Sequence, residues 1–332
     1  MKPFQYLRPS KLKAAIEMVS GDPQARYIAG GTNLIDLMKR GIVTPEKLVD
    51  INHLPLKKIE YKSGVLRIGA LALNSEVAAH ETVLQKHPLL AQALDSGASG
   101  QLRNMATVGG NILQKTRCTY FYDTALPCNK RDPESGCSAL EGINRLHAIF
   151  GTETENPAKT CIAVHPSDMC VALSALDADV LLSGPGGERR MKIADLHRLS
   201  GDTPEVDTTL ERGELITAVE IPDNAFARNS HYLKLRDRAS YAFAIVSVAA
   251  ALDIDNGKIR TARLAMGGVA HKPWRLIAAE KSLEGQPVTE SSFRKAAEVA
   301  MVGARGFGQN DFKLKLAPNA IVQALLTAAG IE

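Results

Sequence analysis

Four of the five cysteines lie in one irregular stretch of the chain, where they could bind a metal ion or an iron–sulfur cluster. They are Cys118, Cys128, Cys137 and Cys161. Nine, eight and twenty-three residues separate them, which matches neither ferredoxin runs nor the C-x₂-C pairs of zinc sites. The pattern is therefore compatible with an iron–sulfur cluster, a zinc ion or disulfide-bonded cysteine pairs. Five cysteines in so large a chain favour metal ligation by thiolates over disulfides. Cys170, on the apolar stripe of an expected helix, is predicted to be a buried small hydrophobe.

Two glycine-rich segments precede these cysteines and are typical of phosphate binding. In Ala29-Gly30-Gly31-Thr32-Asn33, paired glycines after a strand let backbone N–H groups converge on a diphosphate, and Thr32 or Asn33 can cap the next helix. Val108-Gly109-Gly110-Asn111 repeats the signal. Neither is the G-x-G-x-x-G fingerprint or a P-loop, and each alone also fits a tight turn without a ligand.

Composition and charge limit the class of protein. The chain has 332 residues, 45% hydrophobic and 23% charged, which is typical of two or three globular domains. Its net charge of +4 is too small to predict a nucleic acid or a membrane surface as partner. Residues 1–21 lack the apolar core of a secretory signal, and no apolar run of about 20 residues occurs. We expect no membrane span and no export by this chain itself.

The elements expected around the motifs alternate between strands and helices. Asn74 is predicted to cap one helix, Pro88 to open another, and Ser167 to cap a third. A turn is expected at residues 184–187. The strands are predicted at residues 26–29, 47–51, 65–69 and 214–221, the last stopped by Pro222.

A domain boundary is predicted in the polar run at residues 223–230, which lacks apolar periodicity. Beyond it, residues 232–252 and 259–269 are β-rich, with a hairpin turn at Asp255-Asn256-Gly257. Helices are expected near residues 293–302 and 320–328. The first domain would cover residues 1–222, with the cysteine-rich insert at about 115–162, and the second domain residues 228–332.

Several segments, taken in order, resemble the FAD-binding subunits of the xanthine dehydrogenase and molybdenum hydroxylase family. They are residues 27–34 (YIAGGTNL), 106–112 (ATVGGNI), Ser167-Asp168, residues 213–216, and Lys234 with Arg238. The resemblance runs nearly end to end. Residues 117–123, 127–131 and 135–137, around the cysteines, are most similar to flavin subunits of bacterial periplasmic aldehyde oxidoreductases.

The resemblance implies an α+β fold, in which a bipartite FAD-binding domain of two α/β subdomains precedes a smaller α+β domain. It implies that Asp168 binds a polar part of the FAD and that Lys234 approaches the flavin. Without it, Asp168 would complement a helix N-terminus and Lys234 would be a solvated strand residue. The implied FAD-binding residues are Ile28, Ala29, Gly30, Gly31, Thr32, Asn33 and Leu34 at the diphosphate, Thr107, Gly110 and Asn111 in a second wall, and Asp168, Ile216 and Lys234.

The cysteine insert departs from the general family pattern, in which the second glycine motif runs almost directly into the Ser-Asp helix. Here residues 113–166 intervene. Similarity to the aldehyde oxidoreductase subunits implies a [4Fe–4S] cluster with Cys118, Cys128, Cys137 and Cys161 as ligands. Tyr241 is the aromatic residue that we expect beside the flavin.

The function that this resemblance implies is electron transfer in a molybdenum-dependent aldehyde oxidoreductase. A molybdopterin-binding large subunit would oxidise the aldehyde, and a [2Fe–2S] small subunit would pass electrons to the FAD here and on to an external acceptor. The alternatives are the flavin subunit of a hydroxybenzoyl-CoA reductase-like enzyme and a noncatalytic, zinc-stabilised scaffold that binds a nucleotide. The resemblance implies export to the periplasm on a partner's signal, whereas the chain alone indicates a cytoplasmic protein.

Overall fold

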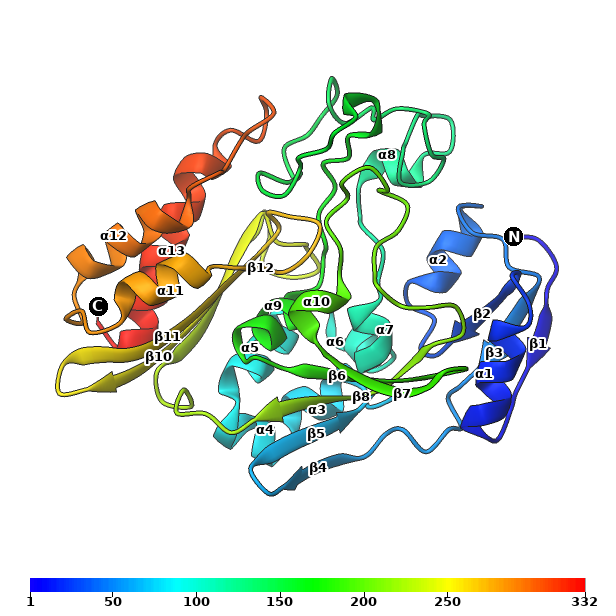
Figure 1. The fold of residues 1–332 in the computed structure, drawn as a ribbon, viewed down its shortest axis with the longest axis horizontal. Helices are drawn as coiled ribbons and strands as arrows, with labels where there is room; N and C mark the ends of the chain where they lie inside the picture. The colour runs from blue at the N-terminus through cyan, green and yellow to red at the C-terminus, as the bar shows by residue number, and fades with distance from the viewer. Residues whose placement is uncertain (332) are drawn as a thin grey trace.

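The computed structural model describes residues 1–331, which form three β-sheets with helices packed against them (Figure 1). The mixed α+β architecture agrees with the fold class predicted from the sequence. Within the described residues, no helix is long and apolar enough to cross a membrane.

The first sheet is parallel and positions the first glycine segment. Its strands are β1 (Gln5–Leu7), β3 (Lys47–Asp50) and β2 (Ala25–Ile28), in that order. Parallel neighbours need crossover connections, which contain α1 (Leu12–Ser20) and α2 (Leu34–Lys39). The predicted strands at residues 26–29 and 47–51 are thus confirmed within one residue.

The second sheet has five antiparallel strands in the order β4-β5-β8-β6-β7. They are β4 (Ile59–Lys62), β5 (Val65–Gly69), β8 (Leu215–Pro222), β6 (Asp179–Gly184) and β7 (Gly187–Lys192). The predicted turn at residues 184–187 joins β6 to β7. The associated helices are α3 (Asn74–Ala79), α4 (Glu81–Lys86), α5 (Pro88–Ser96), α6 (Gly100–Arg103), α7 (Val108–Ile112), α9 (Asp168–Ala175) and α10 (Ile193–Leu196).

Two of the three predicted helix starts are confirmed. Pro88 opens α5, and the Ser167 hydroxyl accepts the Cys170 N–H at 3.1 Å at the start of α9. The prediction for Asn74 is wrong, because Leu73 holds the N-cap position and Asn74 lies inside α3. The Glu76 carboxylate, in the first turn of α3, accepts the Leu73 N–H at 3.1 Å. The start of the helix is thus stabilised by Glu76 instead of by the Asn74 side chain.

The third sheet is antiparallel, in the order β12-β11-β10-β9, and α11, α12 and α13 pack on its outer face (Figure 1). The predicted hairpin turn is confirmed, since Asn256 and Gly257 have φ angles of 49° and 73° between β10 and β11. The elements are β9 (Ser230–Leu235), β10 (Val246–Asp255), β11 (Lys258–Gly267), β12 (Trp274–Arg275), α11 (Ile277–Leu283), α12 (Glu290–Ala300) and α13 (Lys313–Ala329).

Strand β10 is buried on both faces and joins two cores. Val246, Val248 and Ala250 pack into the core beneath α11, α12 and α13. Their neighbours Ala249 and Ala251 face the opposite way, into the core shared with α5 and α9. Because side chains alternate across a strand, the third sheet is held between two layers of helices.

The cysteine insert is mostly irregular and forms the top of the molecule in Figure 1. Its regular elements are α8 (Thr119–Tyr122) and the 3₁₀-helix η1 (Pro157–Lys159). Buried polar side chains fasten it to the third sheet and its helices: Lys313 donates to the carbonyls of His147 and Gly268 at 2.8 and 2.7 Å. Asn310 donates to the Ala148 carbonyl at 2.9 Å. The insert is therefore held in place by hydrogen bonds from side chains that are buried away from water.

We predict a pH-dependent contribution of Lys313 to stability. Burial lowers the pKa of this amine to about 7, so between about pH 7 and pH 10.4 the unfolded chain carries a proton that the folded chain has lost. Stability should rise with pH in this window, by roughly 2 kcal/mol from pH 7 to pH 9. Lys313→Met should be less stable throughout and lack this rise. Thermal unfolding at both pH values tests this, and an equal rise in both proteins would contradict it.

Candidate functional site

Two adjoining hollows form a groove between the glycine segments. The first, of about 300 Å³, lies over β2 and α2, and the second, of about 580 Å³, extends to the chain between β9 and β10. They share Thr32, Asn33 and Gly110, so one long ligand can occupy both. The predicted residues that line the first hollow are Ile28, Ala29, Gly30, Gly31, Thr32, Asn33, Leu34, Thr107, Gly110 and Ile216.

The first wall of the groove offers unpaired backbone donors. Among the described residues, none accepts a hydrogen bond from the N–H groups of residues 30–33. Gly31 has a φ of 72°, a left-handed conformation that glycine adopts without strain. The amide Nδ2 of Asn33 is also buried without a partner, while its Oδ1 accepts the Lys115 N–H at 2.9 Å. These donors fit the oxygens of a diphosphate.

Gly30 brings the two walls into direct backbone contact. A Cβ atom at Gly30 would lie 1.8 Å from the carbonyl oxygen of Met105. Only glycine fits there, because the opposing atom belongs to the backbone and has no rotamer to change. The first glycine segment is thus held against the chain that leads into the second one.

The second wall is organised by caps and side-chain hydrogen bonds. The Thr107 hydroxyl accepts the Gly110 N–H at 3.2 Å and caps α7. Asn111 lines the second hollow, and its Oδ1 accepts the Ser167 hydroxyl at 2.5 Å and the Gln114 amide at 2.8 Å. The start of α9 is thereby fixed against the second glycine segment.

Asp168 and Lys234 pair with each other in a buried network. Lys234 Nζ lies 2.8 Å from Asp168 Oδ2 and donates to the Ser96 carbonyl at 3.0 Å. Tyr232 donates to Asp168 Oδ1 at 2.7 Å. Asp168 lines a third cavity, of about 240 Å³, whereas Lys234 lines none of the three. Because its side chain is 3% exposed, Lys234 is not the solvated residue expected without the family resemblance.

The far end of the groove contains residues that sequence reasoning largely missed. Ala98 and Tyr241 have φ angles of 50° and 52°, and the Tyr241 N–H donates to the Ala98 carbonyl at 3.3 Å. Such strained non-glycine residues cluster at ligand sites. Arg238 stacks over the Tyr241 ring, 5.5 Å from its centroid. Arg238 belongs to a segment that carries the family resemblance, and Tyr241 is the aromatic residue expected beside the flavin, whereas no local motif marks Ala98.

The four cysteines of the insert gather beside this end of the groove. Cys118 lines the third cavity, which shares Arg117, Leu146 and Phe243 with the second hollow. Cys128 and Cys137 face each other in an isolated β-bridge, and Cys161 is near enough for Cys137 and Cys118 to influence its pKa. All five cysteines are free. Burial raises the pKa of Cys161 to about 12, and the Lys130 ammonium opposes this rise.

The spacing of these sulfurs limits what they can bind. No three of the four lie within 4.8 Å of one another in the part of the chain that the structure describes. Four thiolates 2.3 Å from one zinc ion would lie roughly 3.8 Å apart. The described cysteines therefore do not form a closed site for one zinc ion, whereas the ligands of a cluster bind separate irons and lie farther apart than this.

Comparison with known proteins identifies the family. Residues 2–224 match the FAD binding domain in molybdopterin dehydrogenase, and residues 231–328 match the CO dehydrogenase flavoprotein C-terminal domain. The chain belongs to the FAD-binding subunits of the molybdenum hydroxylase family. It is 48% identical over 332 residues to the aldehyde oxidoreductase FAD-binding subunit PaoB of Escherichia coli K12, covering 99% of each chain. It is therefore an oxidoreductase subunit.

The chain is also similar to more distant proteins, one of them by sequence and two by solved structure. The glyceraldehyde dehydrogenase medium chain of Sulfolobus acidocaldarius is 27% identical over 89% of this chain and 85% of its own. The crystal structure of quinoline 2-oxidoreductase from Pseudomonas putida 86 matches with a TM-score of 0.75 and 28% identity, covering 99% of both chains. Reconstituted CO dehydrogenase from Oligotropha carboxidovorans has a TM-score of 0.77 at 24% identity and supports the fold alone.

Gly31→Val should abolish FAD binding while the chain remains folded. A β-branched side chain at a φ of 72° costs about 1–2 kcal/mol and moves the N–H groups that would face the diphosphate. Flavin absorbance per protein, after removal of free FAD, measures the effect. Gly41→Val is the matched control, because Gly41 has the same φ of 72° but nothing within 4 Å of its Cβ position. Full flavin content in the Gly31 variant would contradict the assignment.

Proposed function

We propose that the chain is the electron-transfer subunit of a molybdenum-dependent aldehyde oxidoreductase, and that it carries FAD and a [4Fe–4S] cluster. The observation that carries the proposal is the cavity beside Cys118, which continues into the far end of the groove through Arg117, Leu146 and Phe243. It would place the cysteine ligands next to the flavin. The 48% identity to an aldehyde oxidoreductase subunit supports an aldehyde as the substrate of the complex.

The chain itself would bind and orient these carriers, which supply the redox chemistry. Residues 28–34 would hold the diphosphate of FAD, and Thr107, Gly110 and Asn111 would form the opposite wall, with Ile216 in apolar contact beneath it. Asp168 and Lys234 would shape the flavin end through their buried pair. We assign these roles, apart from that of Lys234, to a first domain, residues 1–222. Lys234 and the flank formed by Arg238 and Tyr241 belong to a second domain, residues 228–332.

Cys118, Cys128, Cys137 and Cys161 would hold the cluster. A cluster with four thiolate ligands is anionic, and a nearby cation offsets this charge. Lys130 supplies one: its side chain is buried, bonds Asp207 and the Pro204 carbonyl, and lies close enough for Cys161 and Cys128 to raise its pKa. The 48% identity to an oxidoreductase subunit argues against the noncatalytic, zinc-stabilised scaffold as the second candidate.

A molybdopterin-binding large subunit and a [2Fe–2S] small subunit would complete the complex, and an external acceptor would take the electrons. Similarity to the Escherichia coli aldehyde oxidoreductase subunit supports this heteromeric assembly and the preference for an aldehyde over a hydroxybenzoyl-CoA substrate. We propose a periplasmic location, reached by export with a signal-bearing partner.

The purified subunit, loaded with FAD and iron, should not oxidise aldehydes. Its groove and cysteines would bind electron carriers, and substrate activation is assigned to the partner. Turnover of an aldehyde with an artificial electron acceptor is the measurement, with the reassembled complex as the positive control. Aldehyde oxidation by the subunit free of its partners would refute this division of labour.

Cys161→Ser should deplete iron, whereas Cys170→Ala should not. Cys161 lies in a loop beside Cys118 and Cys137, while Cys170 lies within α9 and is bonded to the Ser167 cap through its backbone. Loss of the Cys170 side chain should leave the iron content unchanged and cost roughly 1 kcal/mol of packing. Iron per chain and the visible spectrum test both variants. Depletion of iron in the Cys170 variant alone would show that the ligand set is wrong.

A further inference from the structure

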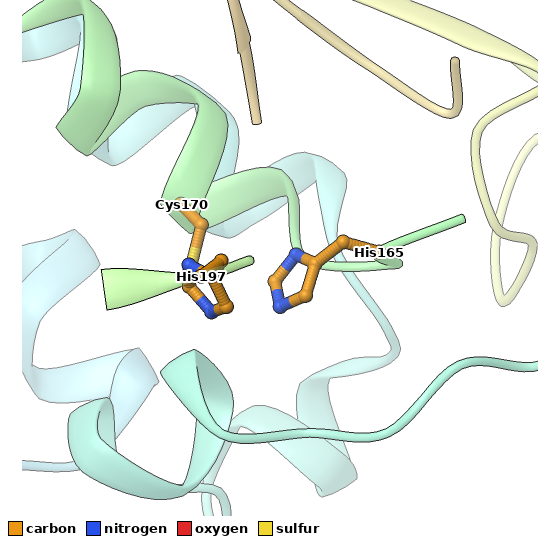
Figure 2. Close-up of side chains that lie close together, drawn as sticks. All are labelled: His165, Cys170 and His197. Atoms are coloured by element: carbon orange, nitrogen blue, oxygen red, sulfur yellow. The ribbon is translucent and has the colours of Figure 1, made fainter. Parts of the chain in front are cut away.

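A second group of metal-binding side chains, separate from the four insert cysteines, lies where the insert returns to α9. Ligand atoms of His165, Cys170 and His197 all lie within 4.8 Å of one another. Figure 2 shows Cys170 pointing from α9 toward His197, with the His165 ring alongside. The two ring centroids are 4.3 Å apart. His165 precedes α9 and His197 follows α10, so the group forms only in the folded chain.

Both imidazoles are held by the same backbone carbonyl. The Nε2 atoms of His165 and His197 lie 3.3 and 2.9 Å from the oxygen of Ile112. A carbonyl only accepts, so each Nε2 carries the proton and each Nδ1 keeps its lone pair. Histidine ligands of metals typically donate their other ring N–H to such a carbonyl.

One of these lone pairs has no partner among the residues that the structure describes. His197 is 3% exposed, and its Nδ1 is buried without a hydrogen bond in the described structure. Leaving such an acceptor unsatisfied costs about 1–3 kcal/mol. Burial lowers the pKa of both histidines, which keeps them neutral as metal binding requires.

The geometry points to a buried site for one thiophilic d¹⁰ cation, copper(I) or zinc(II), bound by Cys170 Sγ and the Nδ1 atoms of His165 and His197. Ligand atoms about 2.0–2.3 Å from one ion lie roughly 3.5–4 Å apart, which fits this group. Thiolate and imidazole ligands suit both ions. As the ion binds, the Cys170 thiol releases its proton to solvent and becomes a thiolate.

Charge balance favours copper(I) over zinc(II). With one thiolate and two neutral imidazoles, copper(I) gives a buried site without net charge, whereas zinc(II) leaves one uncompensated positive charge. Near the histidines, the ammonium groups of Lys130 and Lys115 share the one Asp207 carboxylate. Lys272 adds a further positive charge beside His197, so the surroundings disfavour an uncompensated dication. The ion would tie the end of the insert, α9 and the end of α10 to the carbonyl of Ile112.

Metal analysis of the complete purified complex tests this site. After exposure to copper(I) or zinc(II) and removal of loose metal, the wild-type protein should keep one such ion per chain. X-ray absorption at the edge of that element should show sulfur and nitrogen ligands, without interference from flavin or iron. Cys170→Ala and His197→Gln should each lose the ion, and their iron and FAD contents should remain at the wild-type level.

His87→Gln is the matched control, since His87 is 1% exposed and has an unpartnered Nε2 but lies outside the group. It should keep the copper or zinc. If Cys170→Ala does not fold, His165→Gln replaces it in the comparison. The inference is wrong if the wild-type protein retains neither ion, or if either histidine variant retains it fully. Iron and flavin are measured in the same samples. A protein that lacks iron or flavin but keeps the copper or zinc contradicts the proposed function and not this inference.

Discussion

The buried pair of Asp168 and Lys234 sets the relative position of the two halves of the chain. Asp168 begins α9, whereas Lys234 and Tyr232 lie on β9. Breaking such a pair strands a charge in a nonpolar interior, which typically costs 3–5 kcal/mol. The pair also bonds the end of α5 through the Ser96 carbonyl. Since Ser167 bonds Asn111, the same contact fixes the second glycine wall relative to the third sheet.

Most buried polar side chains elsewhere in the structure are hydrogen-bonded within the protein, whereas the groups that line the groove are left free to bind a ligand. Lys313 and Asn310 donate hydrogen bonds to backbone carbonyls of the insert, and Lys130 forms an ion pair with Asp207. By contrast, the N–H groups of residues 30–33 donate to no acceptor among residues 1–331. These residues are half-buried, and converging backbone donors that face a hollow form a site that an anionic ligand can complete.

Local features of the fold were predictable from the sequence, and contacts between distant residues were not. Ser167 as a cap and Asn256-Gly257 as a turn depend on a few neighbouring residues, which the sequence displays directly. The Asn74 prediction failed because the side chain of Glu76 takes over the capping role. The neighbouring sequence does not show that Gly30 contacts Met105 or that Cys170 lies beside His197. Both contacts join residues far apart in the chain and depend on the tertiary fold.

The bond between Asn111 and Ser167 has a consequence for how this family can diversify. The chain leaves the core after α7 and returns at the start of α9, and these two points are joined by a hydrogen bond of 2.5 Å. The whole cysteine-bearing segment is therefore a loop whose ends already touch. A gene can gain or lose such a loop without disturbing either glycine wall. Evolution can thus change the length and the side chains of this segment while the FAD-binding core stays the same.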